Sequence, residues 1–215
     1  MFHRLFFVFS WLVLFALAFS AAEPEAVKRD LPRLKPTESA DALATFTVKS
    51  GFRIELTAAE PFVTDPVSMA FEENCRLFVV EMIGYSEHRD DRLGQVRLLE
   101  DENGDGRYDR STIYARDLAW PTAIVCYDGG VFIGATPDIL FLKDTDGDQK
   151  ADERRVIFTG IGDGVNRLNM QSLMNSFRWG HDNRIHGTAS GTPGKVRVVG
   201  KPAVSYTHLT LPTKA

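Results

Sequence analysis

The stretch "DENGDGRYD" at residues 101–109 returns as "DTDGDQKAD" at residues 144–152, 43 positions further along the chain. Each copy follows an apolar strand-like run and precedes another such run. Asp, Asn and Gly favour tight turns, so each copy is expected to form the tip of a β-hairpin. A strand–acidic loop–strand unit that recurs at this spacing is typical of a repeated all-β architecture.

A second repeat lies on other residues and has a longer period. It consists of three similar strand starts, "NCRLFVV" (74–80), "DGGVFIG" (128–134) and "DNRIHG" (182–187). Leu77, Val131 and Ile185 take the same place in this series and are 54 positions apart. An insertion in the first unit, "GYSEHRDDRLG" at 84–94, explains why the two periods differ. The segment "GIGDGVNRLNM" at 160–170 lengthens the second unit after its acidic loop.

These repeats predict an all-β fold and, within it, a partial β-propeller of about three four-stranded blades over residues 44–203, with calcium-type loops on hairpins. Strand-like runs of five to eight residues separated by turn residues fill this region, and no apolar stripe of helical period interrupts them. Propellers close with four to eight blades, so the chain is expected to be part of a larger propeller protein.

The two ends have a different character. Residues 1–22 combine a basic start, an apolar run and small residues, which predicts a cleaved signal peptide, with an uncleaved membrane anchor as the alternative. We therefore expect an exported protein that is periplasmic or secreted. If the apolar run stays as an uncleaved anchor, the protein is expected to be membrane-associated. Residues 23–43 are expected to be a linker. Residues 204–215, "VSYTHLTLPTKA", break the repeat and are expected to be artefactual or unstructured, unless they are a genuine short tail.

The composition excludes some classes of protein. An apolar fraction of 44% and a charged fraction of 25% are those of a globular chain, and the net charge of −4 argues against a nucleic-acid partner. Cys75 and Cys126 are too few for a disulfide scaffold. Buried free thiols are expected, with a bridge between them as the alternative. The sequence contains no C-x-x-C-H motif, so no haem is expected in this chain.

The acidic loops have the ligand spacing of calcium sites. EF-hand-type loops bind Ca²⁺ through positions 1, 3, 5, 9 and the carbonyl of position 7. The corresponding residues are Asp101, Asn103, Asp105, Arg107 and Asp109 in the first loop, and Asp144, Asp146, Asp148, Lys150 and Asp152 in the second. Gln149 replaces the preferred Gly at position 6, and position 12 is Thr112 or Arg155, so the shell is incomplete. A structural calcium ion is predicted in each loop, and a metal-free turn is the alternative.

Two polar segments are candidates for a functional site. In "YSEHRDDR" at 85–92, His88 is predicted as a catalytic base and Arg89 as the group that grips an anionic cofactor or substrate. In "NSFRWGHDNRIHG" at 175–187, Arg178 and His181 are the second pair of candidates. The alternatives are a solvated charged loop for the first segment and sheet core plus turn for the second.

Strand alternation makes a further prediction for the second segment. Phe177 and Trp179 are expected to be buried on one face while Arg178 faces the other. The sequence offers neither a Ser/His/Asp arrangement nor a phosphate-binding glycine loop, so hydrolase and nucleotide-binding functions have no specific support.

Three long segments resemble one family: 51–82, 85–109 and 118–152, together with "NSFRWGHDNRIHG". They are similar to the N-terminal propeller of the membrane-bound dehydrogenases of planctomycetes and verrucomicrobia, which are related to glucose/sorbosone dehydrogenases and to PVC-type haem-binding proteins. The likeness covers residues 44–200. Cys75 stands where that family usually has Gly.

The resemblance implies a quinone-dependent oxidation of a sugar or alcohol, with PQQ or another quinone as cofactor. Electrons would pass to a cytochrome module that lies outside this chain, so the chain alone is expected to be inactive. The expected partners are a small sugar or alcohol and the rest of the parent protein. The alternative function is a non-catalytic, calcium-stabilised propeller that binds carbohydrate or protein.

Overall fold

The computed structural model describes residues 34–163, 168–189, 194–200, 204–206 and 208–211. The chain divides into two units, residues 1–46 and 47–215. In the first, the described residues contain the one-turn helix α2 (Ser39–Ala42) and the 3-10 turn η1 (Leu43–Thr45), so the expected linker ends in a short helix. The predicted signal peptide, 1–22, lies outside the described residues. Among those described, no helix is long and apolar enough to span a membrane.

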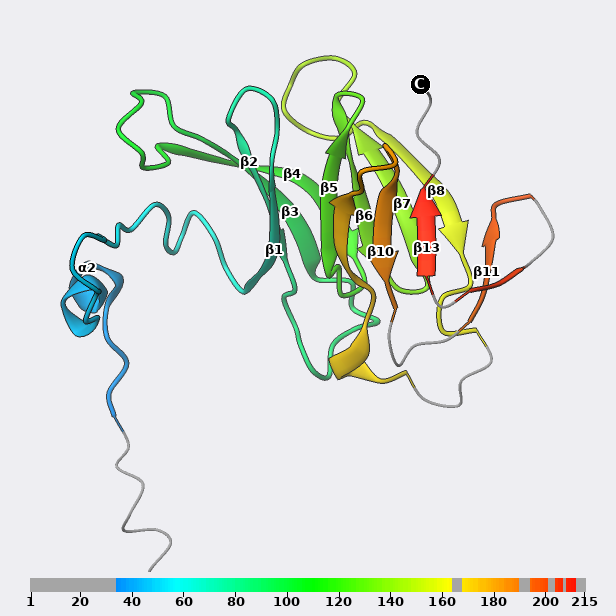
Figure 1. The fold of residues 1–215 in the computed structure, drawn as a ribbon, viewed down its shortest axis with the longest axis horizontal. Coiled ribbons are helices and arrows are strands. Elements are labelled where there is room, and N and C mark those ends of the chain that lie inside the picture. Colours follow the sequence, from blue (N-terminus) through cyan, green and yellow to red (C-terminus); the bar gives the residue numbers. More distant parts are fainter. Residues whose placement is uncertain (1–33, 164–167, 190–193, 201–203, 207, 212–215) are drawn as a thin grey trace, which may run out of the picture. The chain divides into compact units, whose positions relative to one another are not determined.

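The second unit begins with a four-stranded antiparallel sheet, which we call sheet 1 (Figure 1). Its strands pair in chain order and are β1 (Pro66–Phe71), β2 (Leu77–Glu81), β3 (Gly94–Glu100) and β4 (Arg110–Leu118). Strand β2 lies in the middle and is buried along its whole length. Residues 46–65 precede β1 without helix or strand.

Sheet 2 repeats this meander. It consists of β5 (Ala123–Tyr127), β6 (Gly130–Ala135), β7 (Asp138–Lys143) and β8 (Glu153–Thr159), again paired in chain order. Strand β11 (Gly194–Val198) pairs with β8, and β12 (Val204–Tyr206) pairs with β11.

Sheet 3 contains the hairpin of β9 (Asn175–Trp179) and β10 (Ile185–Thr188), with β13 (His208–Leu211) beside β10. The 3-10 turn η2 (Met170–Ser172) leads into β9. Two stretches of the tail predicted to be unstructured, 204–206 and 208–211, are therefore extended strands. That the tail is artefactual stays a prediction.

The predicted repeats fall on equivalent places in the sheets. Leu77 and Ile185 begin β2 and β10, and Val131 is the second residue of β6. Both acidic loops connect the third and fourth strands of their sheet. The last paired residues before each loop are Glu100↔Arg110 in sheet 1 and Lys143↔Glu153 in sheet 2. The all-β class is thus confirmed, and sheets 1 and 2 repeat the same four-stranded meander, whereas sheet 3 contains three strands instead of the predicted four because β11 and β12 pair with sheet 2.

The insertion is also where the sequence places it. Residues 82–93 connect β2 to β3 and include the insertion, whereas β6 and β7 are joined by only two residues, Thr136 and Pro137. The first sheet therefore carries one long polar loop at the end of its second strand, which we call the β2–β3 loop.

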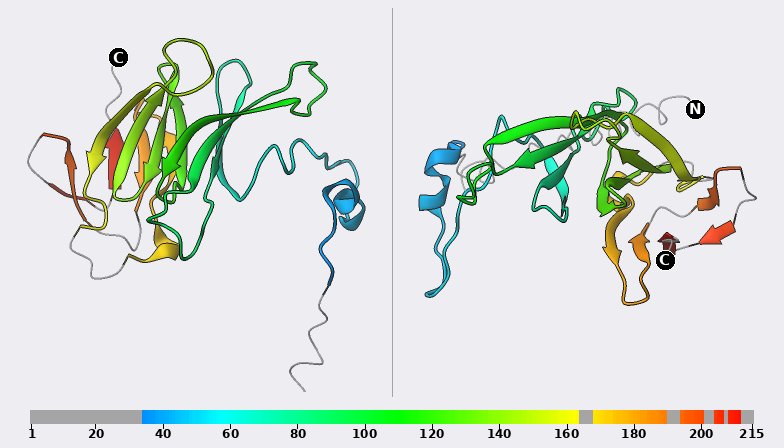
Figure 2. Two further views of the ribbon diagram at one scale, coloured as in Figure 1. Left: turned by 180° about the vertical axis from the view of Figure 1, so that it is seen from behind. Right: turned by 90° about the horizontal axis from the view of Figure 1, so that it is seen from above.

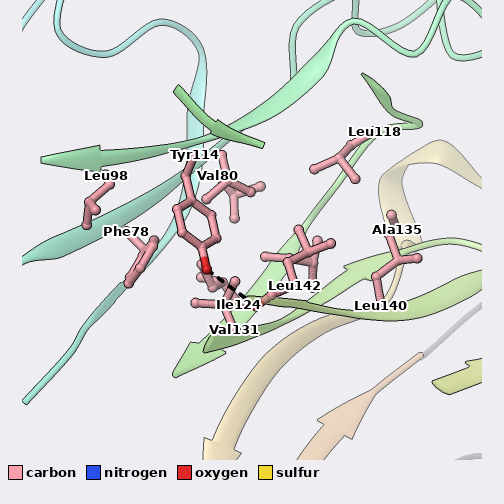
Figure 3. Close-up of a cluster of buried hydrophobic side chains, with 12 residues drawn as sticks. Phe78, Val80, Leu98, Tyr114, Leu118, Ile124, Val131, Ala135, Leu140 and Leu142 are labelled. Atoms are coloured by element: carbon pink, nitrogen blue, oxygen red, sulfur yellow. Dashed lines mark hydrogen bonds between the residues drawn. The ribbon is translucent and has the colours of Figure 1, made fainter. Parts of the chain in front are cut away.

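Apolar side chains fill the space between sheets 1 and 2 (Figure 3). Phe78 and Val80 of β2 face this core from one side, and Val131 and Ile133 of β6 face it from the other. The rings of Phe78 and Tyr114 meet edge to face, with 4.9 Å between their centroids. Burial of this many large side chains is the main stabilising contribution to the pair of sheets.

The opposite face of sheet 2 packs on the β9–β10 hairpin, which Figure 2 shows from two further directions. Phe132 of β6 and Phe141 of β7 belong to this second core, together with Phe177 and Ile185 of the hairpin. Val131 and Ile185, which are equivalent in the repeat, thus both face the preceding sheet. The interface between sheets 1 and 2 and the interface between sheet 2 and the hairpin are therefore formed by corresponding faces of the sheets.

Two predictions about burial are wrong. Cys75 is exposed rather than buried, because it lies in the tight β1–β2 turn at φ +64°, while Cys126 is partly buried; both are free thiols. Trp179 is 48% exposed, whereas Phe177 is buried as expected. Trp179 ends β9, and its ring lies beside that of Tyr127, with 6.1 Å between the ring centroids.

Candidate functional site

The two acidic loops have the same internal hydrogen bonds. The carboxylate of Asp101 accepts the backbone N–H groups three and five residues further on, at 2.7 and 2.9 Å. The carboxylate of Asp144 accepts the equivalent pair, also at 2.7 and 2.9 Å. The first ligand position of each loop is therefore fixed by its own backbone.

Positions 3, 5 and 9 follow the same scheme. Each side chain at positions 3 and 5 accepts the N–H group two residues further on, at 2.8 Å in both cases in the first loop and at 3.2 and 2.8 Å in the second. Asp109 and Asp152 at position 9 accept the N–H group of position 2, at 2.9 and 3.0 Å. These bonds hold the oxygen-bearing side chains of a loop together.

The carboxylates in the second loop lie close enough to share one cation. One oxygen from each of Asp144, Asp146 and Asp148 lies within 4.8 Å of the others. Hydrogen bonds from Lys150 and Thr145, respectively, lower the pKa of Asp148 and of Asp152, so both are ionised at neutral pH. Grouped anionic oxygens repel one another unless a hard cation such as Ca²⁺ neutralises them, so the residues fit that ion.

The second loop also contacts sheet 1. Its first N–H group, that of Asp144, donates to the hydroxyl of Tyr114 at 3.0 Å, and the N–H group of Ala151 donates to the carbonyl of Tyr114 at 2.8 Å. Burial raises the pKa of Tyr114 to about 12. The sequence does not reveal this contact, because Tyr114 reads as an ordinary strand residue.

The β2–β3 loop holds the first pair of predicted catalytic residues. Nδ1 of His88 lies 2.9 Å from the Asp91 carboxylate, and both side chains are exposed. Arg89 turns the other way: its Nη2 donates to the Thr136 carbonyl at 2.5 Å, and its guanidinium lies 3.5 Å from Asp90. A carboxylate that holds one ring nitrogen is the arrangement that orients a histidine base.

The second predicted pair lies elsewhere. Arg178 is an exposed residue of β9, and His181 is exposed in the β9–β10 turn. This turn precedes β10, whereas the β2–β3 loop follows β2, the strand equivalent to β10. The pairs therefore lie at opposite ends of their sheets (Figure 1), and the structure does not bring them together.

Comparison with known proteins gives one family. None of the curated proteins matches the chain. One family matches residues 38–210, which include every strand from β1 to β12 and most of β13. The chain belongs to the family described as "Domain of unknown function (DUF7133)".

Proposed function

We propose that the sheets are blades of a β-propeller whose acidic loops bind calcium. The repeated stacking supports the first part of this proposal. Ile185 of sheet 3 packs on sheet 2 as Val131 of sheet 2 packs on sheet 1, so one packing rule relates successive sheets. Units that cannot bury both faces alone, and that stack in this regular way, are characteristic of propellers.

Exposed apolar residues on the edge strand β1 support a larger assembly. Met69 pairs with Val79 as Ile124 pairs with Ile133, which makes Met69 and Ile124 equivalent positions. Ile124 is 4% exposed between the sheets, whereas Met69 is 65% exposed, and its neighbours Val67 and Phe71 are also exposed. A further blade of the parent protein would cover this apolar row, in agreement with the expectation that the chain is part of a longer propeller.

The observation that carries the calcium proposal is the matched set of hydrogen bonds in two loops 43 residues apart. Asn and Asp side chains in turns commonly accept a backbone N–H group two residues further on. Here, the side chains at positions 1, 3, 5 and 9 of each loop all accept backbone N–H groups. The loop carbonyls and the remaining carboxylate lone pairs are left for a cation. The role proposed for the ion is structural, since each loop closes a hairpin.

Thermal unfolding with and without calcium tests this proposal. The full chain is stripped with EGTA and heated in excess EGTA, in CaCl₂ or in MgCl₂ at equal ionic strength. Saturation at about 100 times the dissociation constant stabilises a protein by about 2.7 kcal/mol per site, so CaCl₂ is expected to raise Tm by several degrees. Equal Tm values in all three solutions would exclude calcium stabilisation.

The β2–β3 loop supports a second candidate function, the oxidation of a sugar or alcohol by a quinone cofactor. His88, held at Nδ1 by Asp91, would take the substrate hydroxyl proton at Nε2. Arg89 would hold the carboxylates of the cofactor, because its guanidinium group fits the geometry of a carboxylate. When bound, the quinone would accept the hydride.

Redox assays separate this function from a carbohydrate-binding or protein-binding propeller. An oxidoreductase predicts that the longer parent protein reduces a dye only with added PQQ, and that His88→Ala and Arg89→Ala abolish this reduction. Sugar binding without turnover would favour the binding module. The proposed export is checked separately, by N-terminal sequencing of the secreted or periplasmic protein, which should begin near residue 23.

A further inference from the structure

A pocket of about 420 Å³ lies where the β2–β3 loop meets the end of sheet 2. Its polar lining comes from three segments that are far apart in the sequence: Arg89, Asp90 and Arg92 from the loop, Thr136 of the β6–β7 turn with Asp138 at the start of β7, and Arg154 from β8. The acidic loops, the proposed calcium sites, follow the opposite ends of β3 and β7. The pocket is thus separate from them.

The charge of the lining is positive. Three guanidinium groups stand against the two carboxylates of Asp90 and Asp138. The Asp90 side chain is 97% exposed, so water screens most of its effect on Arg89, 3.5 Å away.

Neutral backbone groups hold the arginines in place. Arg92 Nε donates to the Asp117 carbonyl at 3.0 Å, and Arg154 donates to the carbonyls of Arg116 and Asp117 at 3.0 and 3.1 Å. These carbonyls satisfy some of the N–H groups and fix the side chains, but they carry no net charge. The guanidinium groups are therefore held by neutral groups, while the carboxylates of Asp117 and Asp138 offset part of the Arg154 charge.

The pocket wall also contains buried polar atoms that lack a partner. The Thr136 hydroxyl, on a residue that is 2% exposed, and Arg89 Nε make no hydrogen bond with any of the described residues. Leaving a buried polar group without a partner costs about 1–3 kcal/mol. Both atoms are themselves buried, so neither is a donor that a ligand in the open pocket can reach.

We propose that this pocket binds a small organic carboxylate, with Arg92 and Arg154 supplying the charge and the hydrogen-bond donors. Guanidinium groups match the geometry of carboxylate oxygens, and a pocket of this size accommodates a molecule larger than a bare inorganic ion. The pocket shares Arg89 with the proposed quinone-dependent oxidation, but binding of a carboxylate requires neither calcium nor a redox reaction, so a binding measurement tests it separately.

Isothermal titration of the full chain with gluconate tests this proposal. Glucose is the matched control, because it has the same carbon number and no charge, and inorganic phosphate is the second control. At constant ionic strength, gluconate is expected to bind at least about tenfold more tightly than glucose, the effect of one charge-assisted hydrogen-bonded pair. No gluconate binding, equal glucose binding or tighter phosphate binding would each overturn the proposal.

Variants locate the site. Arg92→Gln and Arg154→Gln should each weaken gluconate binding about tenfold, whereas Arg184→Gln, which changes an exposed arginine of the β9–β10 turn outside the pocket, should leave it unchanged. Equal affinities in Arg92→Gln, Arg154→Gln and wild type, or an equal loss in Arg184→Gln, would contradict the assignment.

Discussion

The side-chain amide of Gln149 donates a hydrogen bond to the carboxylate of Glu100 at 3.2 Å, and so connects the second acidic loop to the last residue of β3 in the other sheet. Its amide oxygen accepts a bond from Thr112 at 3.3 Å. Gln149 has φ +69°, a conformation that favours Gly, and Gly is the residue that calcium loops prefer at this position. The contacts that the Gln149 side chain makes with sheet 1 give a physical reason why Gln stands in place of Gly.

Replacing Gln149 separates these two effects. Gln149→Ala removes both contacts and keeps the strained backbone, so it should destabilise the chain by about 1–2 kcal/mol. Gln149→Gly loses the same contacts but relieves the strain, and should cost about 1 kcal/mol less than the alanine variant. Urea unfolding measures both changes. A glycine variant less stable than the alanine variant would show that backbone strain at this position is unimportant.

Tyr114 should make the stability depend on alkaline pH. Burial raises the pKa of its hydroxyl from 10.0 to about 12, so the native state keeps the proton that the unfolded state releases above pH 10. Stability should therefore fall as the pH rises from 10 to 12. Tyr114→Phe should lose about 1–2 kcal/mol at neutral pH, because the Asp144 N–H group loses its partner, and should show a smaller alkaline decline. An equally steep fall in the free energy of unfolding between pH 10 and 12 in the variant and the wild type would contradict this.

The two cysteines should react at different rates. Cys75 is exposed, whereas burial raises the pKa of the Cys126 thiol to about 11. Because the thiolate is the reactive form, Ellman's reagent at pH 8 should modify one thiol quickly and the other at least about tenfold more slowly. Cys75→Ala should remove the fast phase and Cys126→Ala the slow phase. The reverse assignment would contradict the structure.

Cys75 can also be compared with the glycine that resembling sequences carry at this position. Its φ of +64° favours Gly, so Cys75→Gly should be more stable than Cys75→Ala by about 0.5–1 kcal/mol.

The exposed apolar row of strand β1 provides a matched test of packing. Met69→Ala should change the free energy of unfolding by no more than about 0.5 kcal/mol, because the side chain is 65% exposed. Ile124→Ala, at the equivalent but buried position, should cost about 2–5 kcal/mol. Similar costs for both variants would mean that this chain already covers the Met69 face in solution.

Sequence reasoning found the features that are repeated. Leu77, Val131 and Ile185 fall on equivalent strands, and the insertion becomes the β2–β3 loop, because a repeated unit shows its strands and turns through spacing alone. It failed for Cys75, since a residue in a tight turn can read as part of the strand that follows it. Trp179 was missed because it ends a strand beyond the reach of the core.

The pocket could not be predicted in this way. Arg92 and Arg154 lie in different sheets, and only the packing of sheet 1 on sheet 2 brings their segments together. The same holds for Gln149 and Glu100. Contacts between units depend on the angle and register of the packed sheets, for which neither apolar alternation nor loop spacing carries a signal.

The most direct test of the account is the number of calcium ions that one chain binds. Calcium titrated calorimetrically into the EGTA-stripped and dialysed full chain should give two ions per chain. The double variant Asp146→Asn/Asp148→Asn keeps the oxygens that accept the loop N–H groups but removes two charges from the second loop, and should give one. No binding by the wild type, or unchanged binding by the variant, would contradict the assignment of these loops as calcium sites.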